Sequence, residues 1–325
     1  MKTSFSDFTL NLCNELKLSG RDGTSAAYRS TLRSVERFRA DNEISFEDFT
    51  PEWLKQYERY LTGLGRCRNT VSLYMRMLRS IYNQAVEKEL AADNPRLFDQ
   101  VFTGNDPSAK RAVTPAVIQQ LCGADLESYP SLAMARDLFL LSFYLRGIPF
   151  VDLIHLRRSD LRNGVLSYRR TKTGGLVTVE VEPCAMTLIR RYASSNNRSP
   201  YLLSIVNGSG KNEYKQYQSA LRSYNKRLVR LSLLLKLKTK LSSYVARHSW
   251  ATAAYHAGIP VGVISESLGH SSEKITYTYL ASFDNRTLRK ANRRVIALIK
   301  PGNREEQSSA GYKNQWTKQL FNRME

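Results

Sequence analysis

The sequence is most informative between residues 243 and 280, where it reads Ser243-Tyr244-Val245-Ala246-Arg247-His248-Ser249-Trp250, then Leu268-Gly269-His270 and finally Thr276-Tyr277-Thr278-Tyr279-Leu280. Arg247 lies on a predicted helix, His270 follows a Leu-Gly helix end, and Tyr279 comes nine residues after that histidine. A guanidinium group and an imidazole can hold phosphate oxygens, and a tyrosine hydroxyl can act as a nucleophile. The spacing therefore predicts a compact set of groups that suits attack on a phosphodiester.

Basic residues outnumber acidic ones, so that the net charge is +20 and the isoelectric point is about 9.9. Residues 1–104 carry 15 basic and 14 acidic side chains, whereas residues 105–325 carry 34 and 15. This charge indicates a polyanionic partner, with nucleic acid the first candidate, although a solvated basic surface would give the same net value. Within the first part, residues 59–86 contain no acid and five arginines, which are Arg59, Arg66, Arg68, Arg76 and Arg79.

Length and composition favour an ordered protein of two domains, since 325 residues with 42% hydrophobic content can bury two cores. No run of about 18 apolar residues is present, and the first residues lack an apolar signal core, so we expect a cytoplasmic, nucleoid-associated protein without membrane contact. The cysteines form no Cys-x-x-Cys pair, so neither a zinc site nor a disulfide framework is expected, and no cofactor is implied. They are Cys13, Cys67, Cys122 and Cys184.

The first hundred residues predict helices. A helix capped by Thr24 or Ser25 is expected to run through Ala40, because apolar residues recur there at helical spacing. Thr50 followed by Pro51 is a typical N-cap with proline at the first helical position, and the helix that it opens is expected to reach about residue 61.

A third, longer helix is expected to start at Asn69-Thr70, with Arg76 and Arg79 on the side opposite its apolar face. Residues 104–112 are polar and read as a linker between domains. These signals divide the chain into a helical domain over residues 1–104, a linker over 105–112 and a second domain over 113–300.

The second domain is expected to be mainly helical with a small β-sheet. Residues 164–170 and 176–181 alternate like strands on either side of Thr173-Gly174-Gly175, which predicts a hairpin. Residues 131–144 are strongly apolar and predict a buried helix. Other helices are expected to begin at Thr114-Pro115, Pro183, near Tyr214, and at Ser243, Pro260 and Asp284.

The order arginine, hairpin lysine, arginine, histidine and tyrosine between residues 146 and 279 resembles the tyrosine recombinase (phage integrase) family, and most closely its Bacteroides-type integrases and invertases. The resemblance implies an N-terminal core-binding (SAM-like) domain over 1–104 and a catalytic domain over 113–300. It implies a site-specific recombinase that cleaves and rejoins DNA through a 3′-phosphotyrosyl bond, without metal or ATP.

The same resemblance implies double-stranded DNA as the partner, a homotetramer on two DNA sites and accessory DNA-bending proteins. The tail over 301–325 is then the segment exchanged between protomers, with Trp316, Leu320 and Phe321 as apolar anchors.

Tyr279 is the candidate nucleophile, with Tyr277 as the alternative. Arg247 stands at the arginine of the family's His-x-x-Arg motif, but Tyr244 replaces the histidine. Because a tyrosine with a pKa near 10 is a poor base, Tyr244 either positions the phosphate or leaves the proton step to His270 and solvent. A core role for the neighbouring His248 is as compatible with the sequence as phosphate contact.

Arg146 is the candidate for the first catalytic arginine. In the family, this arginine comes a few residues before an acid-Leu-x-x-Leu pattern, and residues 152–156 match that pattern from Asp152 onward. An alignment without gaps puts Pro149 at the usual arginine position. Arg146 lies three residues earlier, about one helical turn, so its long side chain could reach the same phosphate. Otherwise Arg146 is structural and the site lacks one arginine.

Lys172 is expected at the tip of the hairpin, where the family carries its general-acid lysine. Arg169 and Arg170 belong to the strand and are expected to touch backbone phosphates. An alternating strip ahead of the catalytic helix faces either DNA or solvent, and it consists of Lys236, Lys238 and Lys240.

Two other functions remain open on the sequence. A DNA-binding protein with a degenerate recombinase site would bind without cleaving, because Tyr244 and the displaced Arg146 depart from the family pattern. An enzyme with the chemistry of type IB topoisomerases would relax DNA without depending on a particular sequence.

Overall fold

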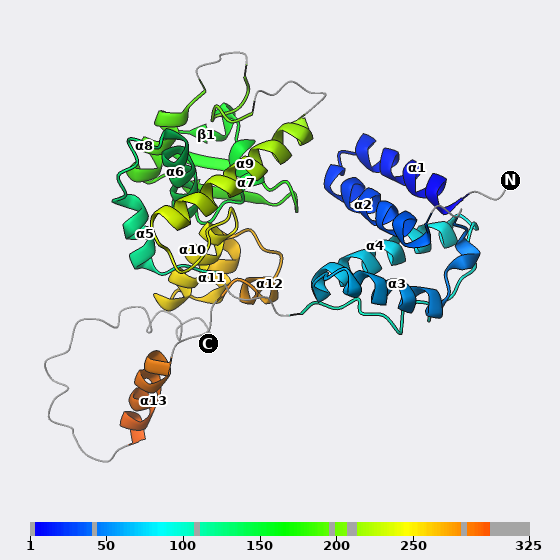
Figure 1. Cartoon of the computed structure of the whole chain (residues 1–325). Coiled ribbons are helices and arrows are strands. Elements are labelled where there is room, and N and C mark those ends of the chain that lie inside the picture. The colour runs from blue at the N-terminus through cyan, green and yellow to red at the C-terminus, as the bar shows by residue number, and fades with distance from the viewer. Residues whose placement is uncertain are drawn as a thin grey trace, which may run out of the picture. The chain divides into compact units, whose positions relative to one another are not determined.

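The structure is a computed structural model that describes residues 4–40, 44–106, 111–194, 199–206, 213–280 and 285–299. The chain divides into two compact units, one formed mainly by residues 1–109 and the other by residues 110–208 and 219–325 (Figure 1). Both are dominated by helices, and the second carries one small sheet. The predicted fold class is confirmed. No helix in the described residues has the length and apolar content needed to cross a membrane.

The described residues of the first unit form four main helices, and the side chains of Ser4 and Thr50 cap two of them. The Thr50 hydroxyl accepts the Trp53 amide at 3.1 Å, which confirms the predicted cap. The predicted Thr24 or Ser25 cap is wrong, because the buried Ser25 hydroxyl donates to the Cys13 carbonyl at 2.8 Å and joins two helices. The helices are α1 (Phe5–Leu18), α2 (Asp22–Arg39), α3 (Pro51–Gly63) and α4 (Arg68–Glu87), with a 3₁₀ turn at Phe46–Asp48.

The core of the first unit is rich in aromatic side chains. Phe49 and Trp53 lie 4.8 Å apart between ring centroids, and Trp53 stacks on Tyr57 at 5.5 Å. Such rings bury large apolar areas and prefer offset or edge contacts. On α4, Met75 and Leu78 are buried while Arg76 is exposed, so the helix separates an apolar face from a basic one as predicted.

The second unit places helices around an antiparallel sheet of order β1-β2-β3. The strands are β1 (Leu161–Arg162), β2 (Val165–Arg169) and β3 (Leu176–Glu180), of which β1 was not predicted. Leu166 and Tyr168 of β2 are buried and pair in register with Val179 and Val177 of β3, which confirms the hairpin and its alternation.

Helices precede and follow this sheet along the chain. The short helices α7 and α12 were not predicted, while the apolar α6 lies within one residue of its predicted bounds. The tail over 301–325, which is predicted to be exchanged between protomers, lies outside the described residues. The helices are α5 (Pro115–Cys122), α6 (Pro130–Tyr144), α7 (Phe150–Ile154), α8 (Pro183–Tyr192), α9 (Glu213–Leu234), α10 (Val245–His256), α11 (Val261–Ser267), α12 (Glu273–Tyr277) and α13 (Asn285–Ile299), with a 3₁₀ turn at Arg158–Asp160.

Candidate functional site

Arg247 on α10 is the centre of the site and is only 2% exposed. Its Nη1 donates to the Gly147 carbonyl at 2.9 Å, and its Nη2 donates to the Leu268 carbonyl at 2.6 Å. Gly147 has φ +70°, and a Cβ there would lie 2.8 Å from the Arg247 Cα. Because only glycine adopts that conformation freely and permits that approach, the loop after α6 can cover the arginine.

His270 is placed by the end of α11. The His270 amide donates to the Ser265 carbonyl at 3.0 Å, and the Gly269 amide donates to the Glu266 carbonyl at 2.8 Å. These are the two hydrogen bonds of a Schellman motif. Gly269 has φ +63°, and a Cβ there would lie 2.8 Å from both the Arg170 Cδ and the Val177 Cγ2. The predicted Leu-Gly helix end therefore fixes the histidine in space.

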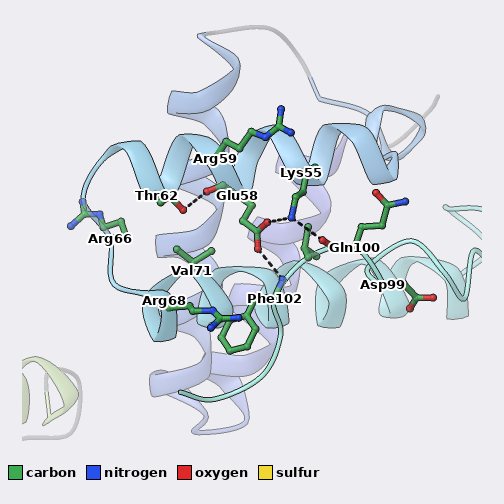
Figure 2. A pocket seen from close by; sticks show the side chains of 11 residues that line it. Lys55, Glu58, Arg59, Thr62, Arg66, Arg68, Val71, Asp99, Gln100 and Phe102 are labelled. Atoms are coloured by element: carbon green, nitrogen blue, oxygen red, sulfur yellow. Dashed lines mark hydrogen bonds and ion pairs between the residues drawn. The ribbon is translucent and has the colours of Figure 1, made fainter. Parts of the chain in front are cut away.

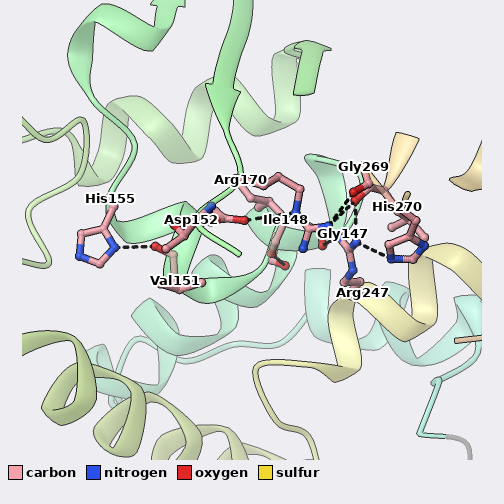
Figure 3. Close-up of polar contacts among 12 residues, drawn as sticks. Gly147, Ile148, Val151, Asp152, His155, Arg170, Arg247, Gly269 and His270 are labelled. Atoms are coloured by element: carbon pink, nitrogen blue, oxygen red, sulfur yellow. Dashed lines mark hydrogen bonds and ion pairs between the residues drawn. The ribbon is translucent and has the colours of Figure 1, made fainter. Parts of the chain in front are cut away.

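The His270 ring makes two hydrogen bonds, and Figure 3 shows the one with Arg247. Its Nε2 lies 2.9 Å from the Arg247 Nη2, and its Nδ1 lies 2.8 Å from the hydroxyl oxygen of Thr276, a fully buried residue of α12. Burial, followed by the charges of Arg247, Arg170 and Lys172, lowers the pKa of His270 to about 4. The imidazole is therefore neutral near pH 7.

Tyr279 packs against this pair. Its ring centroid lies 5.0 Å from that of His270 and 5.3 Å from the Arg247 guanidinium carbon. The Tyr244 ring stacks at 6.5 Å with an interplanar angle of 15°, and the His248 ring lies 4.7 Å away. Burial and then Tyr279 raise the pKa of Tyr244. Three of the predicted site residues, with His248, thus surround Tyr279.

Tyr277, the alternative nucleophile, is 54% exposed, whereas Tyr279 is half-buried among the site residues. His248 also places its Nδ1 3.2 Å from the Tyr279 carbonyl oxygen. This contact supports the structural role that the sequence left open for His248.

Arg170 does not face a solvent-exposed DNA surface as predicted, because it is only 7% exposed. Its Nη1 donates to the Leu268 carbonyl at 3.1 Å and to the Gly269 carbonyl at 2.9 Å, and its Nε lies 3.6 Å from an Asp152 carboxylate oxygen. The other Asp152 oxygen accepts the Thr171 amide at 2.9 Å. Arg170 thus connects α7, the β2–β3 hairpin and residues 268–270 after α11, which we call the histidine loop (Figure 3).

Lys172 lies in the turn between β2 and β3 with an exposed side chain, and its charge acts on His270. Arg146 adopts the left-handed conformation with φ +57°, which costs a residue other than glycine about 1–2 kcal/mol. Its Nη1 lies 3.4 Å from the Thr178 carbonyl of β3, and its backbone adjoins the Gly147 that contacts Arg247. Arg146 is therefore next to the site, but its side chain hydrogen-bonds to the sheet.

The other predicted DNA contacts of this unit are exposed. The Arg169 side chain extends from β2 and donates to the Gly174 carbonyl at 3.1 Å. The predicted lysine strip lies between α9 and α10 and is exposed at all three positions, Lys236, Lys238 and Lys240.

In the first unit, a cavity of about 740 Å³ lies beside α3 and the start of α4, and four basic and two acidic side chains are among the residues that line it (Figure 2). The Arg68 guanidinium lies 4.0 Å above the Phe102 ring, and Arg66 is exposed on the same rim. Arg79 lies 5.1 Å above the Phe98 ring. Aromatic rings thus hold two of the predicted arginines in place while Arg66 and Arg76 remain exposed.

The site combines cations with little compensating negative charge. Burial and the charge of Arg170 lower the pKa of Arg247, while Asp152 is the carboxylate paired with Arg170. Such a cluster favours an oxyanion, which would supply the missing charge beside the Tyr279 hydroxyl. Among the described residues, no group of His, Cys, Asp and Glu could hold a metal ion.

Sequence reasoning missed Thr276, and it expected Arg170 to face DNA where the structure turns that side chain inward. Thr276 lies three residues before Tyr279, about one helical turn, which is the signal that could have placed it beside the site. The inward direction of Arg170 follows from its alternation with Leu166 and Tyr168, both buried.

Comparison with known proteins identifies the family of the chain. The phage integrase family model matches residues 111–286, more than half of the chain. The chain belongs to the phage integrase family. The model of the phage integrase SAM-like domain matches residues 4–101, so both parts of the predicted resemblance are confirmed at family level.

Among relatives, this family member is 24% identical over 294 residues to a tyrosine recombinase of Pseudothermotoga lettingae, covering 86% of this chain and 93% of that protein. Tyrosine recombinase XerA of Pyrococcus furiosus is 24% identical over 261 residues, which cover 70% of this chain and 88% of that protein. The structure of a lambda integrase dimer bound to a COC′ core site matches with a TM-score of 0.63 at 14% identity, over 87% of this chain and 80% of that one. This likeness shows a shared fold.

Proposed function

We propose that this protein is a site-specific DNA recombinase of the integrase or invertase type, which cleaves and rejoins DNA through a 3′-phosphotyrosyl intermediate. The convergence of buried Arg247, neutral His270 and Tyr279 carries the proposal. Its membership of the phage integrase family adds support. Solved proteins of similar fold include a XerH recombinase bound to a palindromic difH substrate after cleavage, which supports duplex DNA as the partner.

In the proposed reaction, the Tyr279 hydroxyl gives its proton to solvent, and its oxygen attacks the scissile phosphorus. The new bond joins the tyrosine oxygen to phosphorus, and the bond to the 5′ oxygen breaks. Lys172, exposed at the hairpin turn, gives its proton to that leaving oxygen. Rejoining reverses these steps with a 5′-hydroxyl of the partner strand, so neither an oxidant nor ATP is consumed.

Charge stabilisation is assigned to fixed donors. Arg247 is held by two carbonyls and faces His270, so it is oriented before the phosphate arrives. Preorganised donors of this kind stabilise charge that develops in the transition state. Tyr244 is proposed to position the phosphate, and Arg146 to add a second guanidinium from the loop beside Gly147.

Both units are proposed to share the DNA. Residues 1–104 act as the core-binding domain and residues 113–300 as the catalytic domain, joined by the linker 105–112. A homotetramer on two sites, accessory bending proteins and exchange of the tail over 301–325 complete the proposal, with the protein in the cytoplasm at the nucleoid. Phosphate contacts of the first domain are assigned to Arg66, Arg68, Arg76 and Arg79, and those of the second to Arg169, Lys236, Lys238 and Lys240.

The test uses a randomised library of nicked duplexes, in which loss of the short fragment beyond the nick traps the covalent intermediate. Wild-type protein is expected to capture a subset of sequences in an adduct that resists denaturant. Tyr279→Phe should capture none, because only the nucleophilic oxygen is lost, whereas Tyr277→Phe should match wild type.

Capture by Tyr279→Phe but not by Tyr277→Phe would show that the nucleophile is misassigned. Binding without any adduct from wild type would identify the non-catalytic DNA-binding alternative, and adducts without sequence preference would identify the topoisomerase-like one.

A further inference from the structure

His270 and Arg247 make a contact that only one protonation state of the histidine allows. The Nε2 atom lies 2.9 Å from the Arg247 Nη2. A guanidinium group can only donate hydrogen bonds, so Nε2 has to accept and cannot carry a proton. The proton of the neutral ring is therefore on Nδ1.

Thr276 is the partner that this tautomer requires. Its hydroxyl oxygen lies 2.8 Å from the His270 Nδ1 and accepts that proton's hydrogen bond. Thr276 is fully buried on α12, so the oxygen is held in place without competition from water. A buried N–H without an acceptor would be costly, and the contact with Thr276 removes that cost.

The charged and titratable groups that face His270 come from three elements. Arg247 faces it from α10, Arg170 and Lys172 from the hairpin, and Tyr279 from the segment after α12. All three charges are positive, so they oppose a second proton on the ring. A phosphate oxygen between His270 and Arg247 would reverse that balance, because it could accept from both groups.

We propose that Thr276 is a positioning residue that holds His270 in the Nδ1–H tautomer, so that Nε2 is the nitrogen that takes up a proton when a phosphate binds. In the DNA-free protein, Nε2 accepts from Arg247. In the complex, the same nitrogen donates to a non-bridging oxygen, while Nδ1–H continues to donate to Thr276. One orientation of the ring therefore serves both states.

The tautomer can be measured without DNA. Nitrogen-15 spectra of histidine-labelled protein distinguish protonated from unprotonated ring nitrogens, and the chain has only 4 histidines. The His270 signals are assigned from their loss in His270→Gln. At pH 7 the wild type is expected to show protonated Nδ1 and unprotonated Nε2 at His270.

Variants then test the role of Thr276. Thr276→Ser keeps an acceptor and should retain the wild-type pattern, whereas the isosteric Thr276→Val should shift protonation partly or wholly to Nε2. Thr278→Val is the matched control, since Thr278 is exposed and its hydroxyl donates to the Ile275 carbonyl at 2.6 Å. If Arg247 alone fixed the tautomer, Thr276→Val would keep the wild-type pattern. That result would overturn the role of Thr276, and a protonated Nε2 in wild type would overturn the tautomer assignment itself.

Proton uptake rests on the proposed function and is measured separately. The probe is a duplex selected by adduct capture, bound to Tyr279→Phe protein so that no cleavage follows. His270 is expected to carry both protons at pH 7 in this complex. A ring that stays neutral would refute proton uptake and leave the recombinase function intact, whereas absence of any captured duplex would count against the function and not against the tautomer.

Discussion

Asp152→Asn should destabilise the catalytic unit far more than an ordinary surface substitution. The Asp152 and Arg170 side chains are 1% and 8% exposed, and their nearest charged atoms are 3.6 Å apart. Asparagine has the same shape and can still accept the Thr171 amide through Oδ1. The substitution therefore removes the charge and turns an amide N–H₂ toward the Arg170 Nε, which has no hydrogen-bond partner among the described residues.

The size of the effect follows from leaving Arg170 buried without its counter-charge. Removing one member of a buried ion pair costs about 3–5 kcal/mol. For a unit of about 150–250 residues, each kcal/mol lowers the melting temperature by about 2–4 °C, so the expected shift is about 6–20 °C. Exposed Asp125 offers a matched control, because its carboxylate accepts the neutral amide of Glu127 at 3.1 Å and has no ion pair within the part of the chain that the structure describes.

The assay is differential scanning calorimetry of the full chain, in which the transition of the catalytic unit is followed separately from that of the first unit. Asp125→Asn is expected to change stability by less than about 0.5 kcal/mol. Hydrogen exchange at the Thr171 amide should quicken in Asp152→Asn, because the loss of the ion pair with Arg170 makes local opening of the hairpin base more frequent, even though the amide keeps its acceptor. Equal melting temperatures for the two variants would refute the view that this pair braces the hairpin and the histidine loop.

Three further predictions test separate parts of the site. Arg146→Ala is expected to lose cleavage with a nearly normal melting temperature, because the Arg146 side chain is half-exposed and its bond to the sheet is long at 3.4 Å; a large fall in melting temperature would instead make Arg146 structural. Replacing Arg76 and Arg79 together with alanine should weaken binding across sequences and lower the slope of log affinity against log salt by about one to two units, while bound DNA is still cleaved; an unchanged slope would place this face in solvent. Because the pKa of folded His270 is about 4, below its ordinary value, the unfolded state binds more protons between about pH 6.5 and 4, so the free energy of unfolding decreases as the pH is lowered through that window. His270→Gln should lose less stability than wild type between pH 7 and pH 4.5, and equal losses would contradict the depressed pKa.

Local signals predicted much of the fold correctly. Thr50-Pro51 contains its own cap and starts α3 as expected, and the two alternating runs pair around a glycine turn. These signals work because the hydrogen bonds that they describe are made within a few residues. The start of α2 was wrong for the opposite reason, since Ser25 uses its hydroxyl on Cys13, in another helix.

The candidate site was predicted from order and spacing, and the structure brings Arg247, His270, Tyr244 and Tyr279 together. Their order along the chain could not show how tightly Arg247 is enclosed. That enclosure depends on Gly147, which comes from a loop 100 residues away in sequence and approaches the Arg247 backbone closely. A contact of that separation leaves no local pattern.

The inward direction of Arg170 was predictable from strand alternation, but its positive charge led us to expect a solvent-facing side chain. Its position alternates with the buried Leu166 and Tyr168, so a period of two already directs it inward. A buried arginine needs a carboxylate and carbonyl acceptors, and the chain supplies Asp152 and the end of α11. Lys172 follows two residues later, exposed on a turn whose base these contacts fix. An anchored base beneath an exposed lysine fits the proposed role of Lys172 as the general acid, because the contacts of Arg170 tie that base to the residues that precede His270.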